Sequence, residues 1–166
     1  MKVFVVDSNF FIEAHRAIYP LDVAIGFWSK LKQLAHEGKI ISIDKVKDEL
    51  YQNNDELKKW CQKNLPKDFF KDTDPVLTQY AKISIWVDSK RAHYLPKAIT
   101  EFLAADEADA FLIANGMADL ENRIIVTREV SDPKGKKRIK IPDCCMDMGV
   151  TYVNPIEMFR MLGETF

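Results

Sequence analysis

The feature that most constrains the fold is a series of short apolar runs, each of which stops at a polar or charged residue. Residues 3–6, 39–43, 123–127 and 150–153 are rich in Val and Ile, as are strands that are buried on both faces. Between these runs, apolar residues recur at three- and four-residue spacings, which predicts helices. Strands that alternate with helices form a parallel sheet covered on both faces. The sequence therefore predicts an α/β fold with a central parallel sheet.

Prolines and short polar residues indicate where the predicted helices begin. Pro fits the first turn of a helix because its missing N–H has no partner there, and Asp or Asn caps the same turn. Gly38 is a plausible stop for the first long helix. In chain order, the start signals are Pro20, Asp44, Asn54 or Asp55, Asp74-Pro75, Pro96, Asp106 and Pro155.

Length and cysteine content limit the class of protein. A chain of 166 residues suits one domain, spanning residues 1–166, that buries a full core without a disulfide or a structural metal. The three cysteines are odd in number and form no CxxC pair, so neither a zinc site nor a disulfide framework is expected. Free thiols indicate a reducing compartment, hence the cytoplasm. The first apolar run is too short for a signal peptide or a membrane span.

Four acids are candidates for one catalytic site: Asp7, Glu49, Asp109 and Glu129. Ligands of a parallel sheet bind beyond the carboxyl ends of its strands, where Asp7 follows the first predicted strand and Glu129 the third. Hard cations such as Mg²⁺ and Mn²⁺ prefer oxygen ligands. Phosphodiester hydrolysis needs an activated water and a neutralised phosphate, and one or two metals supply both.

Each of these acids also has a purely structural interpretation. Asp7 suits a turn or a helix cap, and Glu49 a solvated helix surface. Asp109 would complement a helix dipole, and Glu129 would pair with a neighbouring arginine. A phosphatase-like site at Asp7 is disfavoured because no second Asp stands two residues after it and the chain has no Gly-rich phosphate loop. The net charge of −1 neither favours nor excludes a nucleic-acid ligand.

Several segments together resemble the PIN-domain superfamily, and most closely a branch of it catalogued only as a domain of unknown function. The resemblance covers essentially the whole chain, and the block at 107–115 followed by VTRE is its most specific part. The segments are VVDSNFFI, VKDELY, EADAFLIAN, IIVTRE, IPDCCMDMGV and PIEMFRMLG.

The resemblance implies a three-layer α/β/α sandwich and a Mg²⁺- or Mn²⁺-dependent endoribonuclease that cleaves single-stranded RNA. Many PIN proteins are toxins of toxin–antitoxin pairs and many dimerise, so a cognate antitoxin and a homodimer are implied partners. By similarity, Asp7 matches the acid after the first strand, Glu49 the helical Glu, and Asp109 the Asp opening the central helix. Thr127 and Glu129 stand where many PIN domains have a Thr and then an Asp, Thr127 as an outer hydrogen-bond partner of the site.

Glu129 departs from the family pattern, because Glu is one methylene longer than Asp. Its carboxylate would bind the metal in a different position or act through water. Asp143 is the alternative candidate for the fourth acid of the site. The expected metal ligands are therefore Asp7, Asp109 and either Glu129 or Asp143. Ser8 and Asn9 would either orient Asp7 by hydrogen bonds or shape the turn. The departure also motivates an alternative, a catalytically inactive PIN-like module that binds RNA or protein.

A basic run follows the third predicted strand. It would hold the phosphate backbone of RNA through salt-sensitive contacts; the alternative is a solvated loop without a ligand. Its members are Lys134, Lys136, Lys137, Arg138 and Lys140.

Overall fold

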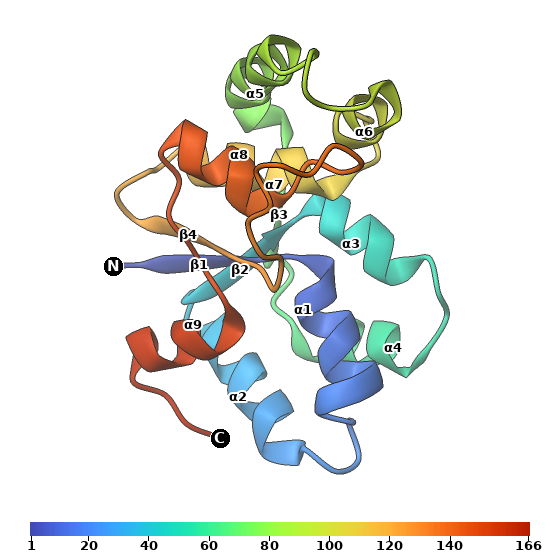
Figure 1. The fold of residues 1–166 in the computed structure, drawn as a ribbon. Helices are drawn as coiled ribbons and strands as arrows, with labels where there is room; N and C mark the ends of the chain where they lie inside the picture. Colours follow the sequence, from blue (N-terminus) through green and yellow to red (C-terminus); the bar gives the residue numbers. More distant parts are fainter.

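The protein is built around a five-stranded sheet in which every strand is parallel to its neighbours (Figure 1). A computed structural model describes residues 1–166. The strands lie in the order β3-β2-β1-β4-β5. The predicted α/β fold with a central parallel sheet is confirmed. The bounds are β1 Val3–Val6, β2 Ile40–Ile43, β3 Phe70–Lys71, β4 Arg123–Val126 and β5 Tyr152–Val153.

Helices cover both faces of the sheet, which gives the three-layer α/β/α arrangement (Figure 1). On one face lie α7 and α8, with α5 packed outside α7; α2 and α9 lie on the other. No helix has both the length and the apolar character needed to cross a membrane. The α-helices are α1 Ser8–Glu13, α2 Ile25–His36, α3 Asp44–Tyr51, α4 Glu56–Asn64, α5 Leu77–Ser89, α6 Pro96–Phe102, α7 Ala108–Met117, α8 Ile141–Met148 and α9 Pro155–Leu162; a π-helix η1 spans Ala14–Ile18 and a 3-10 helix η2 spans Asp74–Val76.

All four predicted strands are present, and β3 is an additional one. It holds only two residues, whose partners are Ser42 and Ile43 of β2, so no sequence period marks it. The last strand begins at Tyr152, two residues later than predicted.

Several helix starts differ from the predictions. The prediction of a helix start at Pro20 is wrong, because a turn closed by the Ala24 N–H on the Pro20 carbonyl (2.8 Å) precedes α2. Asp44 is the first residue of α3 rather than its cap, and its carboxylate accepts hydrogen bonds from Thr73. Glu107, not Asp106, is the N-cap residue of α7.

The buried helix α7 is fixed closely against the sheet. A side chain at Gly116 would bring its Cβ within 2.9 Å of Val150 Cγ1 and 3.0 Å of Ile125 Cδ1. On its outer side, Phe111 stacks on Tyr80 of α5 with ring centroids 4.3 Å apart. These contacts determine where the N-terminus of α7, which carries Asp109, lies relative to the strands.

The strand order creates a crevice at the carboxyl ends of β1 and β4. From β1 the chain builds β2 and β3 on one side, and then crosses to build β4 and β5 on the other. The two neighbouring strands β1 and β4 therefore send their connections to opposite faces, which is where doubly wound sheets bind ligands. Asp7 follows β1 and Thr127 follows β4 at this point.

Candidate active site

Asp7 is a buried acid that caps a helix with one oxygen and leaves the other unbonded. It is the N-cap residue of α1, and its Oδ1 accepts the Phe10 N–H at 2.8 Å. The residue is 6% exposed, and Oδ2 accepts no hydrogen bond from the protein. Burial raises the pKa of Asp7 to about 7; the Phe10 N–H opposes this, and the charges of Glu129 and Glu49 add to it. The capping interpretation is thus confirmed without excluding a ligand at Oδ2.

Glu49 joins the N-termini of two helices. Its Oε2 accepts the Ser8 hydroxyl at 2.5 Å, at the start of α1, and its Oε1 accepts the Ala108 N–H at 3.3 Å, at the start of α7. Of the two alternatives for Ser8, orienting Asp7 or shaping the turn, the first finds no support, because the Ser8 hydroxyl donates to Glu49 and not to Asp7. Asn9 is exposed, and its side chain makes no hydrogen bond in the protein. Glu49 therefore holds together the starts of α1, which Asp7 caps, and α7, which carries Asp109.

Asp109 is the second residue of α7, and its side chain is 18% exposed. Burial raises the pKa of Asp109 to about 8, and the negative charges of Glu129, Glu107 and Asp7 raise it further. Arg138, whose Nη2 lies 3.5 Å from Oδ2 of Asp109, opposes this rise. Asp7 and Asp109 thus share one acidic environment although they come from different elements.

Glu129 belongs to the same cluster, but both of its oxygens are occupied. Oε1 accepts from Arg138 Nη2 at 2.9 Å, and Oε2 accepts the N–H of Ile141, the first residue of α8, at 2.8 Å. The backbone N–H of Glu129 donates to the hydroxyl of buried Thr127 at 3.1 Å. Thr127 therefore fixes the turn after β4 that brings Glu129 toward Asp7 and Asp109.

Asp143, the other candidate for the fourth acid, has a structural role. It is 6% exposed, its Oδ1 accepts the Ser131 hydroxyl at 2.5 Å, and its Oδ2 accepts the Asp132 N–H at 3.0 Å. It anchors to α8 the start of the segment 131–140, which carries the basic run and is called the basic loop. Asp143 also lines a different cavity from Asp109. Glu129, and not Asp143, is among the main charges that raise the pKa values of Asp7 and Asp109.

The donor chemistry of this cluster fits a hard divalent cation. No group of three or more Asp, Glu, His or Cys side chains is close enough to hold an ion by itself. Mg²⁺ is often held by only one or two carboxylates, with water and substrate phosphate completing its coordination. The unbonded Oδ2 of Asp7 and the poorly solvated carboxyl of Asp109 are the atoms suited to that role.

A comparison with protein families covers nearly the whole chain. The model of a family described as a domain of unknown function (DUF4411) matches residues 4–166. The chain belongs to this family. No curated protein matches it. The family description names no activity, and the matched residues include the whole acid cluster from Asp7 to Glu129 of this DUF4411 protein.

The basic loop of the DUF4411 chain is held in place on both sides. The Leu95 N–H donates to the Lys136 carbonyl at 3.0 Å, and the His93 ring lies 2.9 Å from the Gly135 carbonyl oxygen. None of its lysines forms an ion pair. The loop borders a cavity of about 450 Å³ that is open to solvent and has no hydrophobic residue in its lining. The lining residues are Asp132, Gly135, Lys136, Lys137, Arg138 and Lys140. Lys134 lies outside this lining.

Arg138 and Glu107 are site residues that sequence patterns did not assign to the acid cluster. Arg138 pairs with Asp109 and Glu129, although sequence analysis assigned it only to RNA backbone contacts. The contact with Asp109 bridges residues far apart in the chain, so only tertiary packing produces it, whereas Glu129 lies nine residues before Arg138. For Glu107, its position two residues before Asp109 is the signal that was available.

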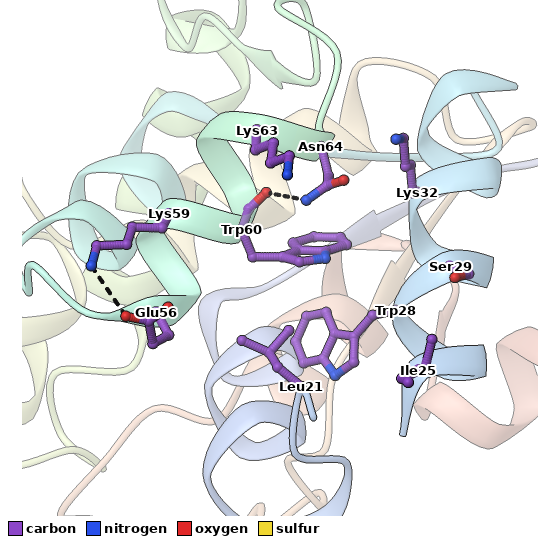
Figure 2. A pocket seen from close by; sticks show the side chains of 10 residues that line it. All are labelled: Leu21, Ile25, Trp28, Ser29, Lys32, Glu56, Lys59, Trp60, Lys63 and Asn64. Carbon is purple, nitrogen blue, oxygen red and sulfur yellow. Dashed lines mark hydrogen bonds and ion pairs between the residues drawn. The ribbon is translucent and has the colours of Figure 1, made fainter. Parts of the chain in front are cut away.

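A separate cavity of about 440 Å³ lies between α2 and α4 (Figure 2). Trp28 and Trp60 meet there edge to face, with ring centroids 4.8 Å apart. Lys32 and Lys63 also line the cavity, and Lys59 turns toward Glu56, with its Nζ 3.1 Å from Oε1. The buried Trp28 donates its Nε1–H to the Tyr19 carbonyl at 2.7 Å. None of the candidate acids lines this cavity.

Proposed function

We propose that this DUF4411 protein is a PIN-type, Mg²⁺- or Mn²⁺-dependent endoribonuclease that hydrolyses phosphodiester bonds of single-stranded RNA. The observation that carries the proposal is the pair Asp7 and Asp109, two acids from different elements in one poorly solvated cluster at the crevice of the sheet. Clusters of strongly perturbed acids are typical of functional sites. Metal-dependent RNA cleavage that Asp7→Asn abolishes is the test.

In this hypothesis the bound metal supplies an activated water and neutralises charge on the scissile phosphate. Asp7, through Oδ2, and Asp109 would hold the metal. Glu49 keeps the N-termini of α1 and α7 together and so fixes the spacing of these two acids. Arg138 borders both the acid cluster and the basic cavity, where it provides a cation beside the phosphate.

RNA would reach the acids along the basic cavity. Its four cations line a space that contains no hydrophobic residue, which suits a phosphate backbone. Because Arg138 lines both this cavity and the one beside Asp109, a strand bound there would continue to the acid cluster.

Replacing Lys136, Lys137 and Lys140 with Gln in an Asp7→Asn background is expected to weaken RNA binding uniformly across sequences. Removing one lysine–phosphate interaction lowers the slope of log affinity against log salt by about 0.7 for a single strand, so the slope for the triple variant should fall by about 2. Fluorescence anisotropy with labelled RNA at several salt concentrations measures this slope. The control is Lys82→Gln, an exposed lysine on α5. An unchanged slope in the triple variant would count against this RNA path.

A role as the toxin of a toxin–antitoxin pair forms part of the proposal and rests on the PIN resemblance, as do a cognate antitoxin and a homodimer as partners. The cytoplasm is the proposed compartment, because Cys61, Cys144 and Cys145 are unpaired thiols. Growth arrest on induced expression supports the toxin role, and normal growth with active protein present opposes it.

A catalytically inactive binding module is the second candidate. The full occupancy of Glu129 by Arg138 and the Ile141 N–H favours it, because a metal would have to compete for those oxygens. RNA binding that persists without any Mn²⁺ binding, measured by calorimetry, would support this candidate over the nuclease.

A further inference from the structure

A small cavity adjoins the acid cluster beside Asp109. Its volume is about 190 Å³, which corresponds to roughly six water molecules by their share of liquid volume. That is room for one planar heterocycle. Asp109 and Arg138 belong both to its wall and to the acid cluster, so a ring bound here lies next to the proposed point of cleavage.

The walls of this cavity combine apolar and acidic groups. Phe102 at the end of α6 and Ile139 of the basic loop, both buried, provide the apolar part. The acidic part is Glu107, which is half-buried at the N-terminus of α7. Apolar side chains beside a few polar groups are the usual lining of sites that bind unstacked bases.

The carboxylate of Glu107 lacks a partner among the side chains of the protein. It forms no ion pair and accepts no hydrogen bond from another side chain, although Arg138 lines the same cavity; the donor that the protein directs at it is the backbone N–H of Ala108. The other two acids of the cavity differ in this respect, because Glu101 is exposed and lies 3.8 Å from Lys97, and Asp109 lies 3.5 Å from Arg138. An ionised carboxylate only accepts hydrogen bonds, so a ligand of Glu107 must bring N–H or O–H donors.

We propose that this cavity is a base subsite that selects guanine; the proposal rests on RNA being the substrate. Among the four RNA bases, guanine alone offers two adjacent donors, N1–H and N2–H, to one carboxylate. Uracil has a single N–H between two carbonyls, and adenine and cytosine each have a ring nitrogen acceptor beside the amino group, which a carboxylate repels. Arg138 suits the other edge of guanine, where O6 and N7 accept hydrogen bonds.

The position of the cavity adds a consequence for the cut. Asp109 borders both the cavity and the acid cluster, so the phosphate nearest the acids is one attached to the bound guanosine. Cleavage is therefore expected at a phosphodiester that adjoins guanosine.

The test is the binding of the four nucleoside monophosphates to the metal-free protein, measured by calorimetry or NMR titration in chelator. GMP is expected to bind about tenfold or more tightly than AMP, CMP or UMP, and Glu107→Gln should weaken GMP binding roughly ten- to a hundredfold. Asp106→Asn is the matched control, because Asp106 is an exposed acid one residue away that does not line the cavity. Melting temperatures check that both variants fold.

Equal binding of the four nucleotides, no binding of GMP, or unchanged GMP affinity in folded Glu107→Gln would overturn the guanine subsite, even if RNA is cleaved. If the protein binds GMP selectively through Glu107 but never cleaves RNA, the proposal of a guanine subsite stands and the proposal of a nuclease is overturned. The two proposals therefore fail separately.

Discussion

Replacing Asp109 with Asn is expected to lower metal-dependent RNA cleavage by more than about a hundredfold, since removing even an outer partner of a metal ligand costs 10- to 100-fold. Asn has nearly the shape of Asp and suits the first turn of a helix, so the charge is the main loss. The measurement is kcat/KM on a labelled single-stranded RNA with saturating Mn²⁺.

The control for Asp109→Asn is Asp106→Asn, which removes an exposed charge three residues earlier. A melting temperature in chelator at pH 8 that equals or exceeds that of the unchanged protein shows that the variant folds. Burial and then nearby like charges raise the pKa of Asp109 to about 8, so its neutralisation should not destabilise the protein. Activity within tenfold of the unchanged protein would remove Asp109 from the catalytic role.

In chelator, the protein is expected to lose stability as the pH rises from about 5 to about 8. Asp7 and Asp109 have pKa values of about 7 and about 8 when folded, and about 3.9 when unfolded. Between these values the folded state binds more protons than the unfolded state, so the free energy of unfolding falls with rising pH. The stabilisation that comes from these two raised pKa values is fully present below about pH 4 and is lost as the pH rises through the folded pKa values.

The size of this effect follows from the shifts. One pKa unit corresponds to about 1.4 kcal/mol, so the raised pKa of Asp7 alone lowers the free energy of unfolding by about 4 kcal/mol as the pH rises from its unfolded to its folded pKa. The two acids interact, so their contributions do not simply add. For a chain of this length, 1 kcal/mol moves the melting temperature by about 2–4 °C. A difference on the order of 10 °C between pH 5 and pH 8 is expected from the pair.

Melting curves at unit pH steps test this expectation in the unchanged protein and in Asp7→Asn. Asn also caps helices well, so the variant keeps the Phe10 contact and should show a flatter pH profile. Mn²⁺ at pH 8 should restore stability to the unchanged protein only, because an ion that binds the folded state stabilises it. Parallel pH profiles for the two proteins would mean that Asp7 is not the desolvated acid described above.

The sequence was sufficient to predict the sheet but not every element around it. The apolar runs identified four strands because parallel strands are buried on both faces. The strand β3 was missed because two residues carry no period. The helix α1 was missed because Asp7-Ser8-Asn9 suits a turn as well as a helix start.

The missed helix α8 carried signals that were available. Pro142 lies in its first turn, and Gly149, with φ of 73°, ends it in the left-handed conformation that glycine tolerates. From the sequence, only Asp143 of this segment was a candidate, as a rival of Glu129 for the fourth acid. Asp143 in fact ties α8 to the basic loop.

The candidate site was predictable in its members but not in its connections. The strand-end rule alone brought Asp7 and Glu129 to one crevice. The contacts of Glu49 with Ser8 and Ala108, which are 41 and 59 residues away, come from tertiary packing that no local pattern encodes. The same holds for Arg138, whose pairing with Asp109 depends on the path of the whole basic loop.

The most direct test of the nuclease hypothesis is to incubate the purified protein with mixed single-stranded RNA and DNA in Mn²⁺, in Mg²⁺ and in chelator, alongside Asp7→Asn. The hypothesis predicts RNA cleavage that requires metal and disappears in the variant. A folded protein that binds Mn²⁺ yet leaves RNA intact, or that cleaves RNA equally well in chelator or with Asp7→Asn, would contradict it.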